Sequence, residues 1–239
     1  YSSHNETAQN GSGEVSLTNV PHGAQVTFTA TPNSGYKVKE WKVDGAVVTG
    51  NTSNSYTYSI AAAVNVKVSF DALFVEGGAS LILSPNKLTI QVNAVTSDGS
   101  AVAVEGCTET SLASGSTYTR LHATGTVVIL KGKIIELSCG DYENGIHNKL
   151  TALNVQGLTA LQVLACNYNQ LTALNVQGLT ALRGLNCDGN WLTVLNMQGL
   201  TALQRLGCWS NQLNADTFKK LFDDLPQRAD SDDAKCILY

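Results

Sequence analysis

The sequence predicts a mainly β fold with some α structure: a short right-handed solenoid of parallel strands with a 21-residue period, preceded by two β-rich modules. Three observations predict this class. Residues 150–170, 171–191 and 192–212 are copies of one unit, and each of the later two matches the first at 15 of 21 positions. The front half alternates apolar and polar residues between turn signals such as PHG and PNSG. Charged residues make up only 14% of the 239 residues, against roughly 25% in an average soluble chain, and Thr, Ser, Asn and Gly supply the polarity.

The repeated unit carries leucines, a cysteine and an asparagine at fixed positions. The first copy reads LTALNVQGLTALQVLACNYNQ, and from Leu161 it follows the pattern L-x-x-L-x-C-x-x-N-x-L, a leucine-rich repeat with Cys in one Leu position. Leu164 and Cys166 are two residues apart, so both side chains should lie on the inner face of a short strand. Parallel strands are expected at 135–139, 162–167, 183–188 and 204–209.

The residues that do not vary between the copies are expected to form a structural ladder. Stacked parallel strands hold equivalent Cβ atoms about 4.8 Å apart, whereas a disulfide needs about 3.8 Å. This spacing favours buried free thiols over disulfides, and a linear row cannot surround a tetrahedral zinc ion. The asparagines fall at the turn after each strand, where an amide can pair with backbone groups. The ladder residues are Cys139, Cys166, Cys187, Cys208, Asn169, Asn190 and Asn211.

A divergent turn precedes the three copies, and a helix follows them. Leu137 and Cys139 match Leu164 and Cys166, but the segment GDYENGIH is inserted after Cys139 and is expected on a loop at the edge of the strand face. Near the other end, NADTFKKLFDDL at 214–225 has helical apolar spacing, with Asn214 as the N-cap.

These patterns predict four parts. They are a flexible tail at 1–13, a β-rich module at 14–74, a β-rich N-terminal cap at 80–133, and the solenoid with its C-terminal cap helix at 134–239.

Two stretches carry a family resemblance. The cysteine-bearing 21-residue repeats resemble those of bacterial surface leucine-rich-repeat proteins of internalin type, in particular internalin J-like repeats. The segment from Gly13 to Gly45 resembles the β repeat module of internalins and many Bacteroidetes surface proteins, in which A-x-P-x-x-G-Y leads to a Trp, here Trp41. The resemblance implies an exported, extracellular protein of the bacterial cell surface, with a role in adhesion and virulence.

The varied positions of the copies predict where a partner binds. Most of the differences alternate with the constant Leu and Cys, so they should face outward, and they include aromatic residues of the kind enriched in binding hot spots. Neutral variation on a solvated surface is the other interpretation. The predicted ligand-binding residues of this strand face are Asn167, Tyr168, Asp188, Trp191, Arg205 and Trp209.

The sequence therefore predicts an adhesion module that contacts a host or bacterial protein or glycan. The alternative is a structural spacer in a larger surface protein. No catalytic motif joins the four histidines, so no enzyme, no catalytic residue, no cofactor and no metal are expected. The net charge of −4 argues against nucleic-acid binding, and the lack of a long apolar run argues against membrane insertion. The chain is expected to be a monomer.

Overall fold

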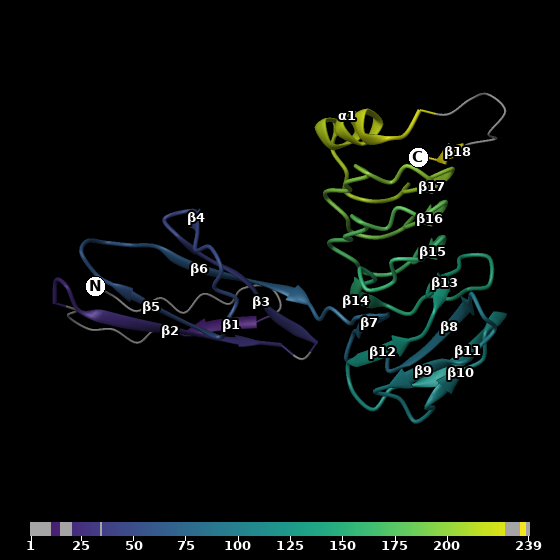
Figure 1. Cartoon of the computed structure of the whole chain (residues 1–239), viewed down its shortest axis with the longest axis horizontal. Coiled ribbons are helices and arrows are strands. Elements are labelled where there is room, and N and C mark those ends of the chain that lie inside the picture. The colour runs from purple at the N-terminus through teal and green to yellow at the C-terminus, as the bar shows by residue number, and fades with distance from the viewer. Residues whose placement is uncertain (1–10, 15–20, 34, 228–234, 238–239) are drawn as a thin grey trace. The chain divides into compact units, whose positions relative to one another are not determined.

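The computed structural model describes residues 11–14, 21–33, 35–227 and 235–237 (Figure 1). The chain divides into two compact units, Tyr1–Leu73 and Phe74–Tyr239. The predicted tail at 1–13 lies mostly outside the described residues, and Gly11 begins the first strand. Each unit is described by itself below.

The front unit consists of two three-stranded antiparallel sheets, in the orders β1-β2-β5 and β4-β3-β6. Its core contains Val38, Trp41 and Phe70, and the Trp41 indole donates a hydrogen bond to the carbonyl of Ser53 at 3.0 Å. Burying the ring while pairing its N–H removes a large apolar surface from water without leaving a polar atom unpaired. The strands are β1 (Gly11–Glu14), β2 (Gln25–Pro32), β3 (Tyr36–Val43), β4 (Ala46–Val47), β5 (Ser55–Ser59) and β6 (Val66–Ala72).

The second unit contains a five-stranded sheet and a seven-stranded sheet. Their orders are β10-β9-β12-β7-β14 and β11-β8-β13-β15-β16-β17-β18. The strands of the first half of this unit are β7 (Gly78–Leu83), β8 (Thr89–Thr96), β9 (Val102–Glu105), β10 (Ser111–Leu112), β11 (Gly115–His122), β12 (Val127–Lys131), β13 (Ile134–Ser138) and β14 (Leu150–Asn154).

Five strands of the larger sheet run parallel, one above the next (Figure 1). Leu137, Leu164, Leu185 and Leu206 are directly in register. From Leu164 to Leu206 the 21-residue period brings the chain back to the same point of the turn, one strand further along the sheet. These leucines are at most 3% exposed and alternate with outward residues, as the period of two in a strand requires. The later strands are β15 (Val163–Ala165), β16 (Gly184–Asn186), β17 (Arg205–Gly207) and β18 (Lys235–Ile237).

The predicted fold class, a short right-handed leucine-rich-repeat solenoid preceded by two β-rich modules, is wrong. The described residues are mostly strands in several sheets with one short helix, and the parallel strands belong to a mixed sheet instead of a separate solenoid. The physical reason lies at β13. Its outer edge is paired antiparallel with β8 through Leu137↔Ala94, so the sheet and its core continue into residues 79–130.

The helix expected at 214–225 is present as α1 (Ala215–Asp224). The Asn214 side chain caps it by accepting a hydrogen bond from the Thr217 N–H at 2.9 Å. Leu221 is fully buried in the same core as the repeat leucines, and Phe218 packs against that core. The helix therefore packs against the core beside the last parallel strands, at the end of the row that is farther from β8 (Figure 1).

Candidate functional site: an aromatic cluster

A row of asparagines sets the shape of the turns that follow the parallel strands. Asn190 donates to the carbonyls of Cys166 and Cys187, both at 3.0 Å, and accepts from the Leu171 N–H at 3.0 Å. Asn169 and Asn211 repeat this arrangement one copy earlier and one copy later. Each amide thus pairs with backbone groups in two successive copies, so the buried carbonyl and N–H groups of the turn have hydrogen-bond partners.

The residue before each asparagine has left-handed backbone. Tyr168 has φ 54°, and Gly189 and Ser210 take nearly the same conformation in the next two copies. A Cβ added at Gly189 would lie 3.0 Å from the Tyr168 ring, so the ring lies directly against Gly189. Glycine at this position therefore provides both the backbone conformation and the space that the neighbouring ring occupies.

The inserted loop at 140–147 is tied down at its base. Asp141 and Ile146 exchange backbone hydrogen bonds, and the Asp141 carboxylate accepts from the Asn144 side chain at 2.8 Å and from the Tyr118 hydroxyl at 3.1 Å. These contacts hold the pKa of Asp141 below its usual range, although its partial burial opposes the shift. Ile146 is 3% exposed. The loop is thereby fixed to the sheet while Tyr142 remains 62% exposed.

Four rings from this loop and from the turns come together, and we call them the aromatic cluster: Tyr142, His147, Tyr168 and Trp209. The Tyr168 ring centroid lies 4.8 Å from that of Tyr142, 5.4 Å from that of His147 and 5.9 Å from that of Trp209. The first two pairs are stacked, and the third is edge-to-face, both of which are favourable ring geometries. Tyr142 and His147 are exposed, and Tyr168 and Trp209 are half-buried.

Asp188 supports the cluster from below. Asp188 is 6% exposed; its carboxylate accepts the backbone N–H of Trp209 at 2.9 Å, and its carbonyl accepts the backbone N–H of Tyr168 at 2.8 Å. Burial raises the pKa of this carboxyl to about 6, and the hydrogen bonds from Trp209 oppose the rise. Gly207 leaves room for the carboxylate, since a Cβ there would lie 2.9 Å from its oxygen.

The structure brings only part of the predicted binding set together. Tyr168 and Trp209 are in contact, but Asn167 and Asp188 are buried, at 5% and 6% exposure. Trp191 is 48% exposed, and Arg205 is exposed at the start of β17. Among the described ring pairs, Trp191 has no partner in the aromatic cluster.

The sequence reasoning missed Tyr142 and His147. The available signal was the inserted segment GDYENGIH, which was expected at the edge of the strand face and contains both residues. Its two rings could have been considered together with Tyr168. Their contact depends on how the loop folds back, and the spacing of the repeats does not determine this.

The cysteines of the repeats are buried free thiols. Cys139, Cys166, Cys187 and Cys208 are at most 1% exposed. Burial raises the pKa of the Cys139 thiol, and that of Cys208, to about 12, so both stay protonated at neutral pH. The Cys187 thiol donates to the Gly207 carbonyl at 3.4 Å. Among the described residues, no three His, Cys, Asp or Glu side chains are placed to hold a metal ion.

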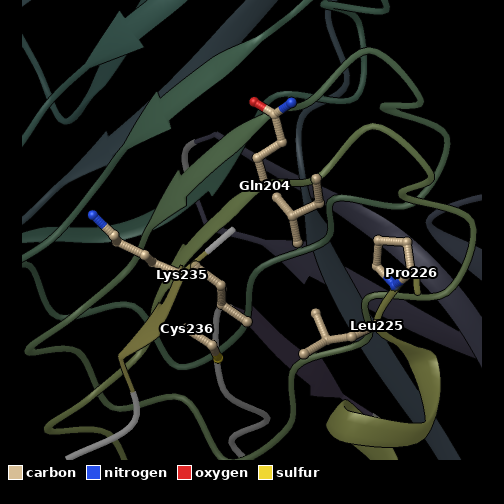
Figure 2. A pocket seen from close by; sticks show the side chains of 7 residues that line it. Gln204, Leu225, Pro226, Lys235 and Cys236 are labelled. Atoms are coloured by element: carbon tan, nitrogen blue, oxygen red, sulfur yellow. The ribbon is translucent and has the colours of Figure 1, made fainter. Parts of the chain in front are cut away.

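A small cavity of about 110 Å³ lies between the end of α1 and β18 (Figure 2). Leu225 and Pro226 face Cys236 across it, and the polar ends of Gln204 and Lys235 point away from it (Figure 2). This apolar gap offers no converging polar groups to orient a ligand. The aromatic cluster is therefore the stronger candidate for a functional site.

The fold and this site define a β-rich protein with an aromatic cluster beside the parallel strands of a mixed sheet. Residues 5–73 match the family model of the divergent InlB B-repeat domain. The front unit therefore carries an internalin-type β repeat module, which is typical of bacterial surface proteins. The match gives no support for a leucine-rich-repeat or cysteine-ladder family, or for a role in virulence. No curated protein and no solved structure matches the chain. In the described part of the chain, no helix has the length and apolar character needed to cross a membrane.

Proposed function

We propose that this chain is an adhesion module of a bacterial surface protein and that the aromatic cluster is its contact site. The observation that carries the proposal is the position of Tyr142, whose ring is 62% exposed on a loop that hydrogen bonds fix in place. Exposed apolar ring surface is unfavourable in water, and the loop contacts hold it there. A surface that is already ordered loses little conformational entropy on binding.

We propose partners outside the cell: a protein or glycan on host cells or on neighbouring bacteria. The match of the front unit to a surface-protein repeat module supports this location. The net charge of −4 gives no general attraction to nucleic acid. Binding by a monomer, without a cofactor, is part of the same proposal.

We also propose that the chain is not an enzyme. The best remaining nucleophile is Cys107, which lies in the same unit as the hydrogen-bonded pair Glu109 and His122. Burial, with the nearby charge of Glu109, raises the pKa of the Cys107 thiol to about 11. A thiol that stays protonated at neutral pH is a poor nucleophile, so this group favours a structural role.

The second candidate function is a structural spacer. The repeat module of the front unit favours it, because such a module can extend a protein from a surface without any ligand of its own. The two functions differ in one respect. Only an adhesion module requires the aromatic cluster.

The test is adherence of beads that carry the whole chain to bacterial and epithelial cells. Tyr142→Ala removes a residue that is 62% exposed, and Trp209→Asn introduces the residue found at the same position of the first copy, Asn167. Phe222→Ala is the matched control, because it removes an exposed ring of α1 that lies outside both the cluster and the predicted binding residues. We expect both cluster variants to lose adherence at least tenfold while the control adheres like the parent. Equal adherence of all four proteins would favour the spacer.

A further inference from the structure

We propose that the aromatic cluster is a stacking platform for a neutral polysaccharide. This inference rests on the proposed function and names the class of its ligand. It depends on three features of the site: the exposed ring surface, the polar residues near the cluster residues in the sequence, and the negative charge of Asp188 and Asp141.

The rings suit the shape of sugars. A pyranose presents a face of C–H groups and a rim of hydroxyls, so it packs on an aromatic ring and still forms hydrogen bonds at its edge. Tyr142 and His147 each stack on Tyr168, so the ring surface left for a ligand consists of the outer faces and the edges. Tyr142, Tyr168 and Trp209 come from the loop and from two copies of the repeat. The cluster therefore extends along the stacking direction of the strands and suits a chain better than a single sugar.

Exposed polar residues lie next to two cluster residues in the sequence. Glu143 follows Tyr142, and Ser210 follows Trp209. Carboxylate and hydroxyl groups of this kind pair with sugar hydroxyls. A protein-binding hot spot would instead be surrounded by contacts that exclude water from the partner's apolar side chains. Short polar neighbours favour a hydrated, hydroxyl-rich ligand.

The charges favour a neutral sugar over an acidic one. The Asp188 carboxylate accepts the backbone N–H of Trp209, and Asp141 lies at the base of the loop that carries Tyr142. Burial raises the pKa of the Tyr168 hydroxyl, and the negative charge of Asp188 adds to the rise, so the field of Asp188 reaches the ring. A uronate or sialate would meet this field and be repelled.

The ring geometry also argues against a cationic ligand. An ammonium group binds between aromatic rings that surround a gap. Here Tyr168 is in direct contact with three other rings, and its ring also lies against Gly189, so these contacts leave little space for a cation between the rings. The surface that remains for a ligand is the outer faces and edges of the rings.

The test uses affinity gel electrophoresis of the whole chain in gels that contain hydroxyethyl cellulose, laminarin, mannan or polygalacturonate, together with a glycan array of neutral and acidic sugars. We expect at least one neutral polymer to retard the protein and polygalacturonate not to do so. Tyr142→Ala and Trp209→Asn should weaken that retardation at least tenfold, and Phe222→Ala should leave it unchanged. Circular dichroism and thermal unfolding establish that each variant is folded.

Two results would overturn the polysaccharide proposal. One is that no neutral glycan binds on the gels or the array, and the other is that folded Tyr142→Ala and Trp209→Asn bind as the parent does. Its failure is separable from failure of the adhesion proposal. If cell adherence depends on the cluster but an excess of every neutral polymer leaves it intact, the contact is with a protein, and only the ligand class is wrong.

Discussion

The Asp188 carboxyl contributes to stability with a pH dependence opposite to that of Asp98, Glu109 and Asp141, whose pKa values are lowered. Its pKa in the folded chain is raised to about 6 by burial, so between pH 4 and 6 the folded state binds more protons than the unfolded state. The contribution of this group to stability therefore falls as pH rises from 4 to 6 and is flat above. Asp188→Asn keeps an acceptor for the Trp209 N–H and removes the ionisation.

We expect Asp188→Asn to be more stable than the parent at pH 7 by about 1 kcal/mol, after allowance for partial solvation of the carboxyl, and equal to it near pH 4. Urea unfolding midpoints at both pH values measure this difference. Glu143→Gln, at an exposed carboxyl of the same region, serves as the control. If Asp188→Asn and the parent show the same pH dependence, the carboxyl is not the cause.

Asn190 is the residue at which we expect a single side chain to matter most for the turns. It donates to the carbonyls of two cysteines and accepts one backbone N–H, all in the interior. Asn190→Ala leaves these groups unpaired and should lower the free energy of unfolding by about 2 to 4 kcal/mol. Asn196→Ala is the comparison, because Asn196 accepts a single N–H, from Gln198 at 2.9 Å. Similar urea midpoints for the two variants would contradict this prediction.

At the scale of the element, the turn between β16 and the next copy depends on Gly189. Its φ is 60°, and a Cβ would press against the Tyr168 ring. Gly178 also has positive φ, but a Cβ there meets nothing within 4 Å. Both Gly→Ala variants should be destabilised by backbone strain of about 1 kcal/mol, and Gly189→Ala by more. Only Gly189→Ala should displace Tyr168 and weaken adherence, which thermal unfolding and the bead assay measure together.

The row of parallel strands also controls the reactivity of the thiols. Four of the six cysteines are buried, whereas Cys236 is exposed and Cys107 is partly exposed. Titration with Ellman's reagent should find no more than two reactive thiols in the native chain and all six after denaturation. Cys187→Ala should cost about 1 to 3 kcal/mol as a small cavity in a packed core. Fewer than six thiols in denaturant would show that disulfides form.

At the scale of the whole molecule, the sequence predicts those elements that depend on the spacing of residues close together in the chain. The 21-residue period is enough to bring Leu164, Leu185 and Leu206 into register, and Asn214 with the apolar spacing after it is enough to place α1. The edge pairing of β13 with β8 is not predictable in this way. It joins segments some 40 residues apart and contains a register shift between Ile134 and Glu136.

The candidate site likewise contains residues that the sequence identifies and residues that only the folded chain brings together. Tyr168 and Trp209 stand out in the sequence because they occupy varied positions of an otherwise constant repeat. Tyr142 and His147 join them only through the fold of the inserted loop, which depends on hydrogen bonds from Tyr118 and Asn144 to Asp141. Asn167 and Asp188 are buried in the turns, where the carbonyl of each accepts from the asparagine side chain two residues later.

The stacking of the parallel strands has a mechanical consequence for a protein displayed on a cell. The hydrogen bonds from β13 to β18 point along the stacking direction, so a pull in that direction loads them in series and opens them one strand at a time. Each 21-residue copy that peels away would release about 70 Å of chain. Under flow, such an element would extend at modest force in successive steps. Because Tyr168 and Trp209 belong to two of these copies, the aromatic cluster would separate as the copies open, and the contact would be released under load.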